Sequence, residues 1–82
     1  MNKTMRTDPL PFERIRNLRV DADLKQKDIA NVLNVRPNTV TQYELGTTRY
    51  PADALIKLAK FYNTSVDYLV GLTDEKEPYP RA

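Results

Sequence analysis

The sequence predicts an all-α fold, a compact globule of five short helices. Apolar residues recur at spacings of three and four, the period of an amphipathic helix, and no segment sustains the alternation of a half-buried strand. Turn-forming residues interrupt this pattern at short intervals, so each helix is short. Because isolated helices of this length are marginal in water, we expect them to be stabilised by packing against one another.

The apolar residues locate the five helices in order. Each helix is expected around one cluster: Phe12, Ile15, Leu18 and Ala22; Ile29, Ala30 and Leu33; Val40 and Tyr43; Leu55, Leu58, Ala59 and Tyr62; Val66, Leu69 and Val70. The breaks between the helices are expected at residues 21–23, 34, 46–48 and 63–65, where turn-forming residues gather.

Four residues suit the expected helix ends. Pro37 fits the first turn of the third helix, because the N–H that proline lacks would be unpaired there in any case. Gly46 fits a left-handed stop after that helix, and Ser65 is a good N-cap for the last one. Asn34 lies between the second and third helices, where a tight turn needs a positive φ, and Asn tolerates this best among the residues other than Gly.

Length and composition exclude several classes of function. The 82 residues suffice for one small domain, and they include no Cys and no His. Disulfides, thiolate or imidazole metal sites and His- or thiol-based catalysis are therefore excluded, and we expect neither an enzyme nor a cofactor. No apolar run is long enough for a membrane span and no signal peptide is evident, so a cytoplasmic location is expected. The net charge of +2 permits nucleic-acid binding but is too small to demonstrate it.

The two ends of the chain differ from its centre. Residues 1–11 and 73–82 are rich in proline and lack helical periodicity, so we expect short flexible tails there. Residues 12–72 are expected to form the folded domain.

A helix-turn-helix is predicted within residues 25–44, KQKDIANVLNVRPNTVTQYE. A helix, a turn through Asn34 and Val35, and a second helix from Pro37 follow one another at the spacing of this motif. The small Ala30 allows the two helices to cross closely. The inward positions are expected to be Ile29, Ala30, Leu33, Val35, Val40 and Tyr43.

The side chains on the outer face of the helix expected from Pro37 are short, polar and uncharged. Amide and hydroxyl side chains of this kind can pair with the edges of bases in the major groove of DNA. The candidate base-reading residues are Pro37, Asn38, Thr41 and Gln42. Contacts with the DNA backbone must come from around this face, from long cationic side chains, hydroxyls and the start of the preceding helix. The candidates are Lys25, Gln26, Arg36, Thr39, Thr47, Thr48 and Arg49.

The sequence resembles the Cro/cI (XRE) family of helix-turn-helix transcriptional regulators from about Phe12 to Leu72. The resemblance is carried by RIRNLR, LKQKDIANVL, VRPNTVTQYELG and ALIKLAKFYNTSVDYLVGLTD, which occur in the order and at the spacing of the family. It implies a five-helix, lambda-repressor-like DNA-binding domain whose third helix enters the major groove. The base-reading positions of the family map onto Pro37, Asn38, Thr41 and Gln42, and its phosphate-contacting glutamine maps onto Gln26.

Four positions depart from the family pattern. The family usually has Ser or Thr at the N-caps where this chain has Lys25 and Arg36, and often Gly where it has Asp23 and Asn34. Lys and Arg are poor caps whose charge opposes the helix dipole, so each is expected to cost about 1 kcal/mol of stability. We therefore hypothesise that Lys25 and Arg36 face phosphates.

The function predicted is a sequence-specific regulator that binds double-stranded DNA, a repressor reading a pseudo-palindromic operator. A homodimer on DNA is expected, because the last helix leaves apolar residues partly outside the core and this region often forms the dimer contact in the family. The candidate contact residues are Tyr68, Leu69 and Leu72. Two alternatives stay open: Tyr79 could fold back to cover these residues, and the domain could be a protein-interaction module of the same fold, such as an antitoxin or an adaptor.

Overall fold

Five helices and no strand make up residues 11–77, the part of the chain that the computed structural model describes. They are α1 (Pro11–Asp21), α2 (Gln26–Leu33), α3 (Pro37–Leu45), α4 (Ala52–Tyr62) and α5 (Val66–Leu69). The all-α prediction is therefore confirmed for these residues. Of the tails expected at residues 1–11 and 73–82, residues 1–10 and 78–82, with Tyr79, lie outside the described residues. Between residues 11 and 77, every helix is too short and too polar to cross a membrane.

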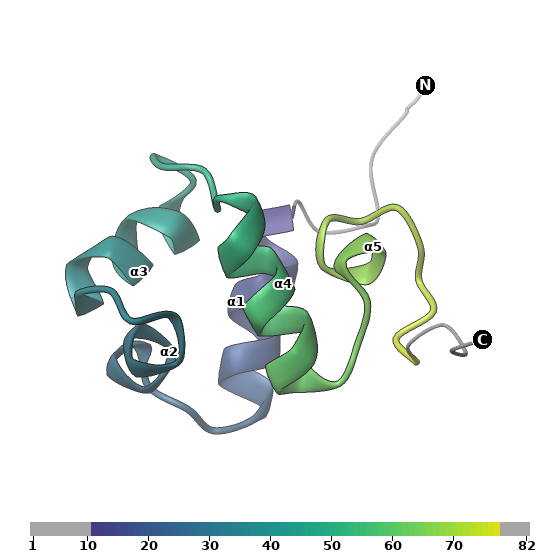
Figure 1. Ribbon diagram of the computed structural model, residues 1–82, viewed down its shortest axis with the longest axis horizontal. Helices are drawn as coiled ribbons and strands as arrows, with labels where there is room; N and C mark the ends of the chain where they lie inside the picture. The colour runs from purple at the N-terminus through teal and green to yellow at the C-terminus, as the bar shows by residue number, and fades with distance from the viewer. Residues whose placement is uncertain (1–10, 78–82) are drawn as a thin grey trace.

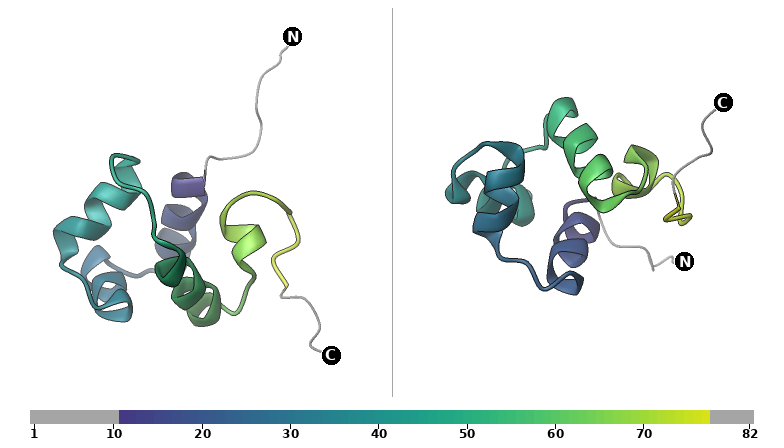
Figure 2. Two further views of the ribbon diagram at one scale, coloured as in Figure 1. Left: turned by 45° about the horizontal axis from the view of Figure 1, so that its top comes forward. Right: turned by 60° about the horizontal axis from the view of Figure 1, so that its bottom comes forward.

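The helices are arranged as a helical pair at one end, two central helices, and a short helix at the other end. Figures 1 and 2 show α2 and α3 together on one side, α1 and α4 in the middle, and α5 on the far side. Helix α3 packs against α1 and α2, and α4 packs against α2 and α5. The α2–α3 pair therefore rests on the central helices by its inner side, while its outer side is left open.

The core occupies the space where these helices meet. Val40 of α3, Leu58 of α4 and Leu69 of α5 are fully buried, which ties three helices to one cluster. The expected inward residues of the helix-turn-helix, Ile29, Ala30, Leu33, Val40 and Tyr43, are all buried, and Val35 is packed against the cluster. One expectation was wrong: Ala22 is exposed because α1 ends one residue earlier, at Asp21.

The helix ends use the residues expected of them. Asn34 has φ 59° and Gly46 has φ 79°, so both end their helices in the left-handed region. Asp23, where the family often has Gly, also has a positive φ of 60°. The Ser65 hydroxyl accepts a hydrogen bond from the backbone N–H of Tyr68 at 3.0 Å and caps α5. Pro37 occupies the first turn of α3.

Residues 73–77 lie against the helices. The guanidinium of Arg14 in α1 donates to the carbonyls of Tyr68 and Thr73 at 2.9 and 2.8 Å and forms an ion pair with Asp74 at 3.1 Å. It also lies 4.5 Å from the centre of the Tyr68 ring. The Thr64 hydroxyl donates to the carbonyl of Lys76. Arg14 therefore joins α1 to α5 and to the segment that follows it.

Candidate nucleic-acid interface

The turn between α2 and α3 is held by backbone hydrogen bonds and by one small side chain. The N–H of Val35 donates to the carbonyl of Ala30 at 3.0 Å, across the left-handed Asn34. Ala30 is only 1% exposed, so the space beside it is filled by the surrounding helices. A larger side chain there would force α2 away from its neighbours. The small side chain of Ala30 therefore leaves room for α2 to pack closely against its neighbours, as the sequence predicted.

Helix α3 presents an uncharged polar surface to solvent. Pro37, Asn38 and Gln42 are exposed, while Thr39 and Thr41 are half-buried. Asn38 and Thr41 are three residues apart and therefore share a face of the helix. The structure brings the four residues predicted to read bases onto one side of one helix.

A buried ion pair fixes the C-terminal end of α3 to α1. The Arg19 guanidinium donates to the two carboxylate oxygens of Glu44 at 2.7 and 3.1 Å, and also to the carbonyl of Leu24 at 2.8 Å. The Arg19 side chain is 13% exposed and the Glu44 side chain is 5% exposed. The hydrogen bond to Glu44 raises the pKa of Arg19 above its ordinary value. Such charge-assisted, two-pronged bonds impose direction as well as attraction, so the pair sets the orientation of α3.

Gln26, at the start of α2, joins this ion pair to the exposed face of α3. Its amide nitrogen Nε2 donates to Glu44 Oε1 at 2.9 Å, and its amide oxygen Oε1 accepts from the Thr41 hydroxyl at 2.6 Å. The same hydroxyl lies 3.3 Å from the carbonyl oxygen of Pro37. Gln26 is therefore a structural link between the two helices, a role that sequence reasoning did not predict.

The loop after α3 is anchored on Gln42. The Gln42 carbonyl accepts from the backbone N–H and the hydroxyl of Thr47, at 3.1 and 3.2 Å. The Thr48 hydroxyl donates to the side-chain oxygen of Gln42 at 3.0 Å. Both threonines are exposed next to α3, and the hydrogen bonds hold them there.

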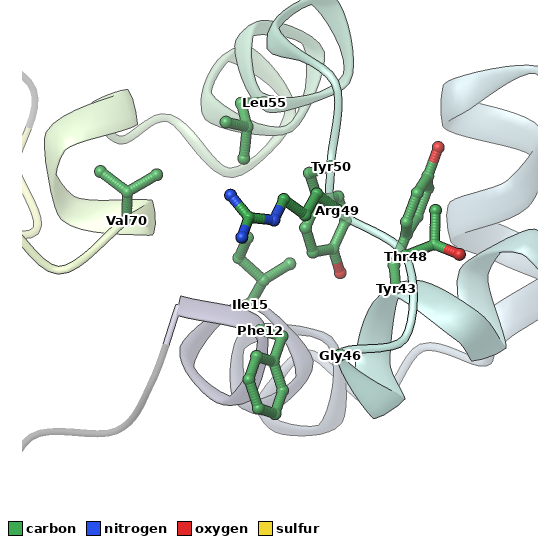
Figure 3. A pocket seen from close by; sticks show the side chains of 9 residues that line it. All are labelled: Phe12, Ile15, Tyr43, Gly46, Thr48, Arg49, Tyr50, Leu55 and Val70. Atoms are coloured by element: carbon green, nitrogen blue, oxygen red, sulfur yellow. The ribbon is translucent and has the colours of Figure 1, made fainter.

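Three exposed cations were predicted to contact the DNA backbone. Lys25 and Arg36 occupy the N-cap positions of α2 and α3 without capping them by a side-chain hydrogen bond. At the start of α2, the Asp28 carboxylate accepts a hydrogen bond from the backbone N–H of Lys25 at 2.8 Å, which partly replaces the missing cap. Arg49 is also exposed, but Figure 3 shows its side chain extending toward Leu55 and Val70. Lys25 and Arg36 lie at the start of the two helices of the motif, and Arg49 lies apart from them.

A largely apolar pocket of about 510 Å³ lies between α1, α4 and the loop after α3. Its lining, drawn in Figure 3, consists of Phe12, Ile15, Tyr43, Gly46, Thr48, Arg49, Tyr50, Leu55 and Val70. The Tyr43 and Tyr50 rings stack with their centres 4.4 Å apart. Burial raises the pKa of the Tyr50 hydroxyl well above its ordinary value, so this hydroxyl stays protonated even in alkaline solution.

The predicted dimer contact is partly wrong. Leu69 is 0% exposed because it points into the core between α4 and α1, so it cannot meet a second copy. Tyr68 is half-buried, with its ring beneath Arg14. Leu72 is 77% exposed. Of the three residues predicted, only Leu72 is largely open to solvent.

The sequence carried a signal for the charged residues that were missed. Arg14 and Glu44 are 7% and 8% exposed. Arg14 precedes Leu18 by four residues and Glu44 follows Val40 by four, so both lie at inward helical spacings. A charged residue at such a spacing predicts a buried partner of opposite charge or a set of carbonyl acceptors.

Comparison with known proteins identifies the family of this chain. The profile of the helix-turn-helix family HTH_3 matches residues 15–69, from α1 to the end of α5. The chain belongs to the Cro/cI (XRE) family of helix-turn-helix regulators. Similar family members include the uncharacterized HTH-type transcriptional regulator YobD of Bacillus subtilis (strain 168), 35% identical over 80% of this chain and 59% of that protein. The cryptic phage CTXphi transcriptional repressor RstR of Vibrio cholerae is 44% identical over 70% of this chain and 51% of RstR.

Solved structures of the family agree with the fold. A transcriptional regulator from Listeria innocua has a TM-score of 0.74 and 37% identity, over 79% of this chain and 61% of that one. The P22 c2 repressor, solved in complex with a synthetic operator, has a TM-score of 0.70 and 28% identity, over 77% of this chain and 96% of the repressor. The chain spans about half the length of the curated relatives it matches. The curated relatives are named as transcriptional regulators or repressors, in agreement with the class of protein predicted from the sequence.

Proposed function

We propose that this protein is a sequence-specific transcriptional repressor that binds double-stranded DNA by inserting α3 into the major groove. The observation that carries the proposal is the exposed, uncharged face of α3, held at a fixed angle by a buried ion pair and flanked by exposed cations. A helix presented in this way is the geometry by which helix-turn-helix proteins read base edges. The relatives named as repressors support the same function.

Base reading is assigned to four residues of α3: Pro37, Asn38, Thr41 and Gln42. Asn38 and Gln42 are exposed amides, which suit paired donor and acceptor contacts with adenine. Pro37 offers only apolar contact, suited to the thymine methyl group. The similar P22 c2 repressor was solved in complex with a synthetic operator, which supports DNA as the ligand of this chain.

Contacts with phosphates are assigned to the residues around α3. Lys25 and Arg36 are exposed at the starts of α2 and α3 and make no side-chain caps, so their charges are free to meet phosphates. Gln26 keeps one amide hydrogen beyond the one that it donates to Glu44, which leaves a donor for a phosphate oxygen. The remaining candidates are Thr39, Thr47, Thr48 and Arg49, of which Arg49 must turn away from Leu55 and Val70 to reach DNA.

We also propose that two copies bind a pseudo-palindromic operator. Paired recognition helices meet half-sites about 34 Å apart, one turn of DNA. The exposed Leu72 is the apolar residue that this arrangement would cover. Leu72→Asp should then weaken cooperative binding to a full operator while leaving binding to an isolated half-site unchanged. Equal effects on both DNAs would exclude Leu72 from the interface.

The decisive experiment is selection of bound duplexes from a random pool, followed by binding measurements from 50 to 200 mM salt. We expect one enriched motif, and an affinity that falls steeply with salt because each neutralised phosphate releases counterions. The enriched site should bind more tightly than random duplex at every salt concentration. A pool without enrichment, or binding insensitive to salt, would instead support a protein-interaction module of the same fold.

Two variants separate base reading from positioning. Gln42→Ala should cost about 1 to 3 kcal/mol on the enriched site and relax preference at one base pair. Arg36→Ala removes a charge from the same helix and should weaken all sequences alike, with a salt slope shallower by about one. If the two variants lose affinity in the same sequence-independent way, the division of roles is wrong.

A further inference from the structure

A chain of hydrogen bonds that starts in the core decides whether the Thr41 hydroxyl on α3 donates or accepts a hydrogen bond. At its inner end, the Glu44 carboxylate is paired with Arg19 and is only 5% exposed. A carboxylate in an ion pair can accept hydrogen bonds but has none to donate. The group of Gln26 that lies 2.9 Å from Glu44 Oε1 must therefore be the amide nitrogen, because an oxygen there would set two acceptors against each other.

The orientation of the Gln26 amide decides the role of Thr41. With Nε2 turned to Glu44, the amide oxygen Oε1 faces the Thr41 hydroxyl at 2.6 Å. The other neighbour of this hydroxyl, the Pro37 carbonyl at 3.3 Å, is also an acceptor. A hydroxyl has one hydrogen and two lone pairs. Since both neighbours accept, the hydrogen of Thr41 is used inside the protein, and only lone pairs remain for an outside partner.

We propose that Thr41 enters the major groove as a hydrogen-bond acceptor, held in that role by Glu44 through Gln26, and that it faces an exocyclic amino group of a base. In the major groove such groups are N6 of adenine and N4 of cytosine, whereas guanine and thymine offer only acceptor atoms and a methyl group. A threonine hydroxyl without such internal hydrogen bonds can either accept or donate, so it would not discriminate adenine and cytosine from guanine and thymine. This inference rests on the proposed binding of α3 in the major groove.

The neighbouring residues place Thr41 where a base can reach it. Thr41 follows Pro37 by four residues and Asn38 by three, and both of these are exposed, so the three share one face of α3. Thr41 itself is half-buried, with its hydroxyl directed toward α2. A guanine or thymine opposite this hydroxyl would set acceptor against acceptor, which disfavours those bases.

The test uses the full 82-residue chain and the duplex it selects from a random pool. Each adenine of that duplex is replaced in turn by purine, and each cytosine by 2-pyrimidinone, which lack the exocyclic amino group. One replacement should weaken binding of the native protein about two- to tenfold, the effect of one net hydrogen bond. The same replacement should have no effect in Thr41→Val, which keeps the shape but lacks the hydroxyl. Thr41→Ser, the matched control, should keep the sensitivity.

A second variant tests whether Gln26 is what makes the Thr41 hydroxyl an acceptor toward the base. Gln26→Met removes the nearer acceptor of the Thr41 hydrogen, at 2.6 Å, and leaves only the Pro37 carbonyl at 3.3 Å, so the hydroxyl is held less firmly and can also donate outward. Its overall affinity should fall, and its preference for adenine or cytosine over guanine or thymine at the Thr41 position should narrow. A preference unchanged from the native protein would overturn the role of Gln26.

The remaining outcomes separate this inference from the proposed function. A random pool that yields no enriched sequence would overturn both. An enriched operator in which no amino replacement is coupled to Thr41→Val would overturn the inference alone. Coupling of Thr41→Val to 7-deazaguanine, which lacks the acceptor N7, would show that Thr41 donates and would reverse the proposed polarity.

Discussion

The buried pair of Arg19 and Glu44 predicts a large loss of stability when one charge is removed. Glu44→Gln keeps the volume of the side chain but leaves the Arg19 guanidinium, 13% exposed, without a counter-charge. Removing one partner of a buried ion pair costs about 3 to 5 kcal/mol. Arg19 keeps its hydrogen bond to the Leu24 carbonyl at 2.8 Å, so we expect the lower value, about 3 kcal/mol. In a domain of this size, that corresponds to a Tm lower by roughly 12 to 24 °C.

A matched control is provided by a second ion pair, between Arg14 and Asp74. The Asp74 carboxylate is 81% exposed, and its partner Arg14 also donates to two backbone carbonyls. Asp74→Asn should therefore cost only about 0 to 1 kcal/mol. The double variant Arg19→Met, Glu44→Leu, which replaces both charges with apolar groups, should recover most of the loss.

Urea unfolding followed by circular dichroism measures all of these free energies on one scale. The reasoning predicts a large gap between Glu44→Gln and Asp74→Asn, with the double variant close to the native protein. If Glu44→Gln is no more destabilising than Asp74→Asn, the pair does not hold α3 in place.

Three further predictions concern the core. Among residues 11–77, the buried Tyr62 hydroxyl has no hydrogen-bond partner, and burial raises its pKa to about 12. The contribution of Tyr62 to stability should therefore be constant up to about pH 10 and fall between pH 10 and 12, because the unfolded chain ionises first. Tyr62→Phe should be at least as stable at pH 7 and should lose less stability over that range in urea titrations; an unchanged pH profile would exclude Tyr62 as the cause. Gly46→Ala should cost more than Gly71→Ala, because a Cβ at Gly46 would lie 3.1 Å from the Phe12 ring while nothing lies within 4 Å at Gly71, and both have positive φ; equal losses would show that Phe12 yields freely. Ala30→Leu should cost about 1 to 3 kcal/mol by overpacking, and native stability in thermal unfolding would argue against the close crossing of α2 and α3.

Local signals account for what could be predicted from the sequence. The left-handed turn at Asn34, the stop at Gly46 and the cap at Ser65 each depend on one residue and its immediate neighbours. The inward positions of α2 and α3 follow from helical spacing in the same way, and these features together identified the motif and its exposed face.

Contacts between distant residues could not be predicted in this way. Arg19 and Glu44 are 25 residues apart, and the partners of Arg14 are 54 to 60 residues away. Leu69 was assigned both to the apolar cluster of the last helix, from its spacing, and to the dimer contact, and its burial agrees with the spacing.

The contacts of Arg14 determine where the folding unit can be cut. The family profile spans residues 15–69, yet the buried guanidinium of Arg14 and two of its acceptors, Thr73 and Asp74, lie outside that span. A fragment trimmed to the profile would lose the hydrogen bonds and the ion pair by which Arg14 joins α1 to the segment after α5. Its last helix, of four residues, would then be held by the packing of Leu69 and its neighbours. An excised, transplantable version of this domain must therefore run at least from α1 through Asp74. Domain borders drawn from sequence similarity alone would cut inside the unit that folds.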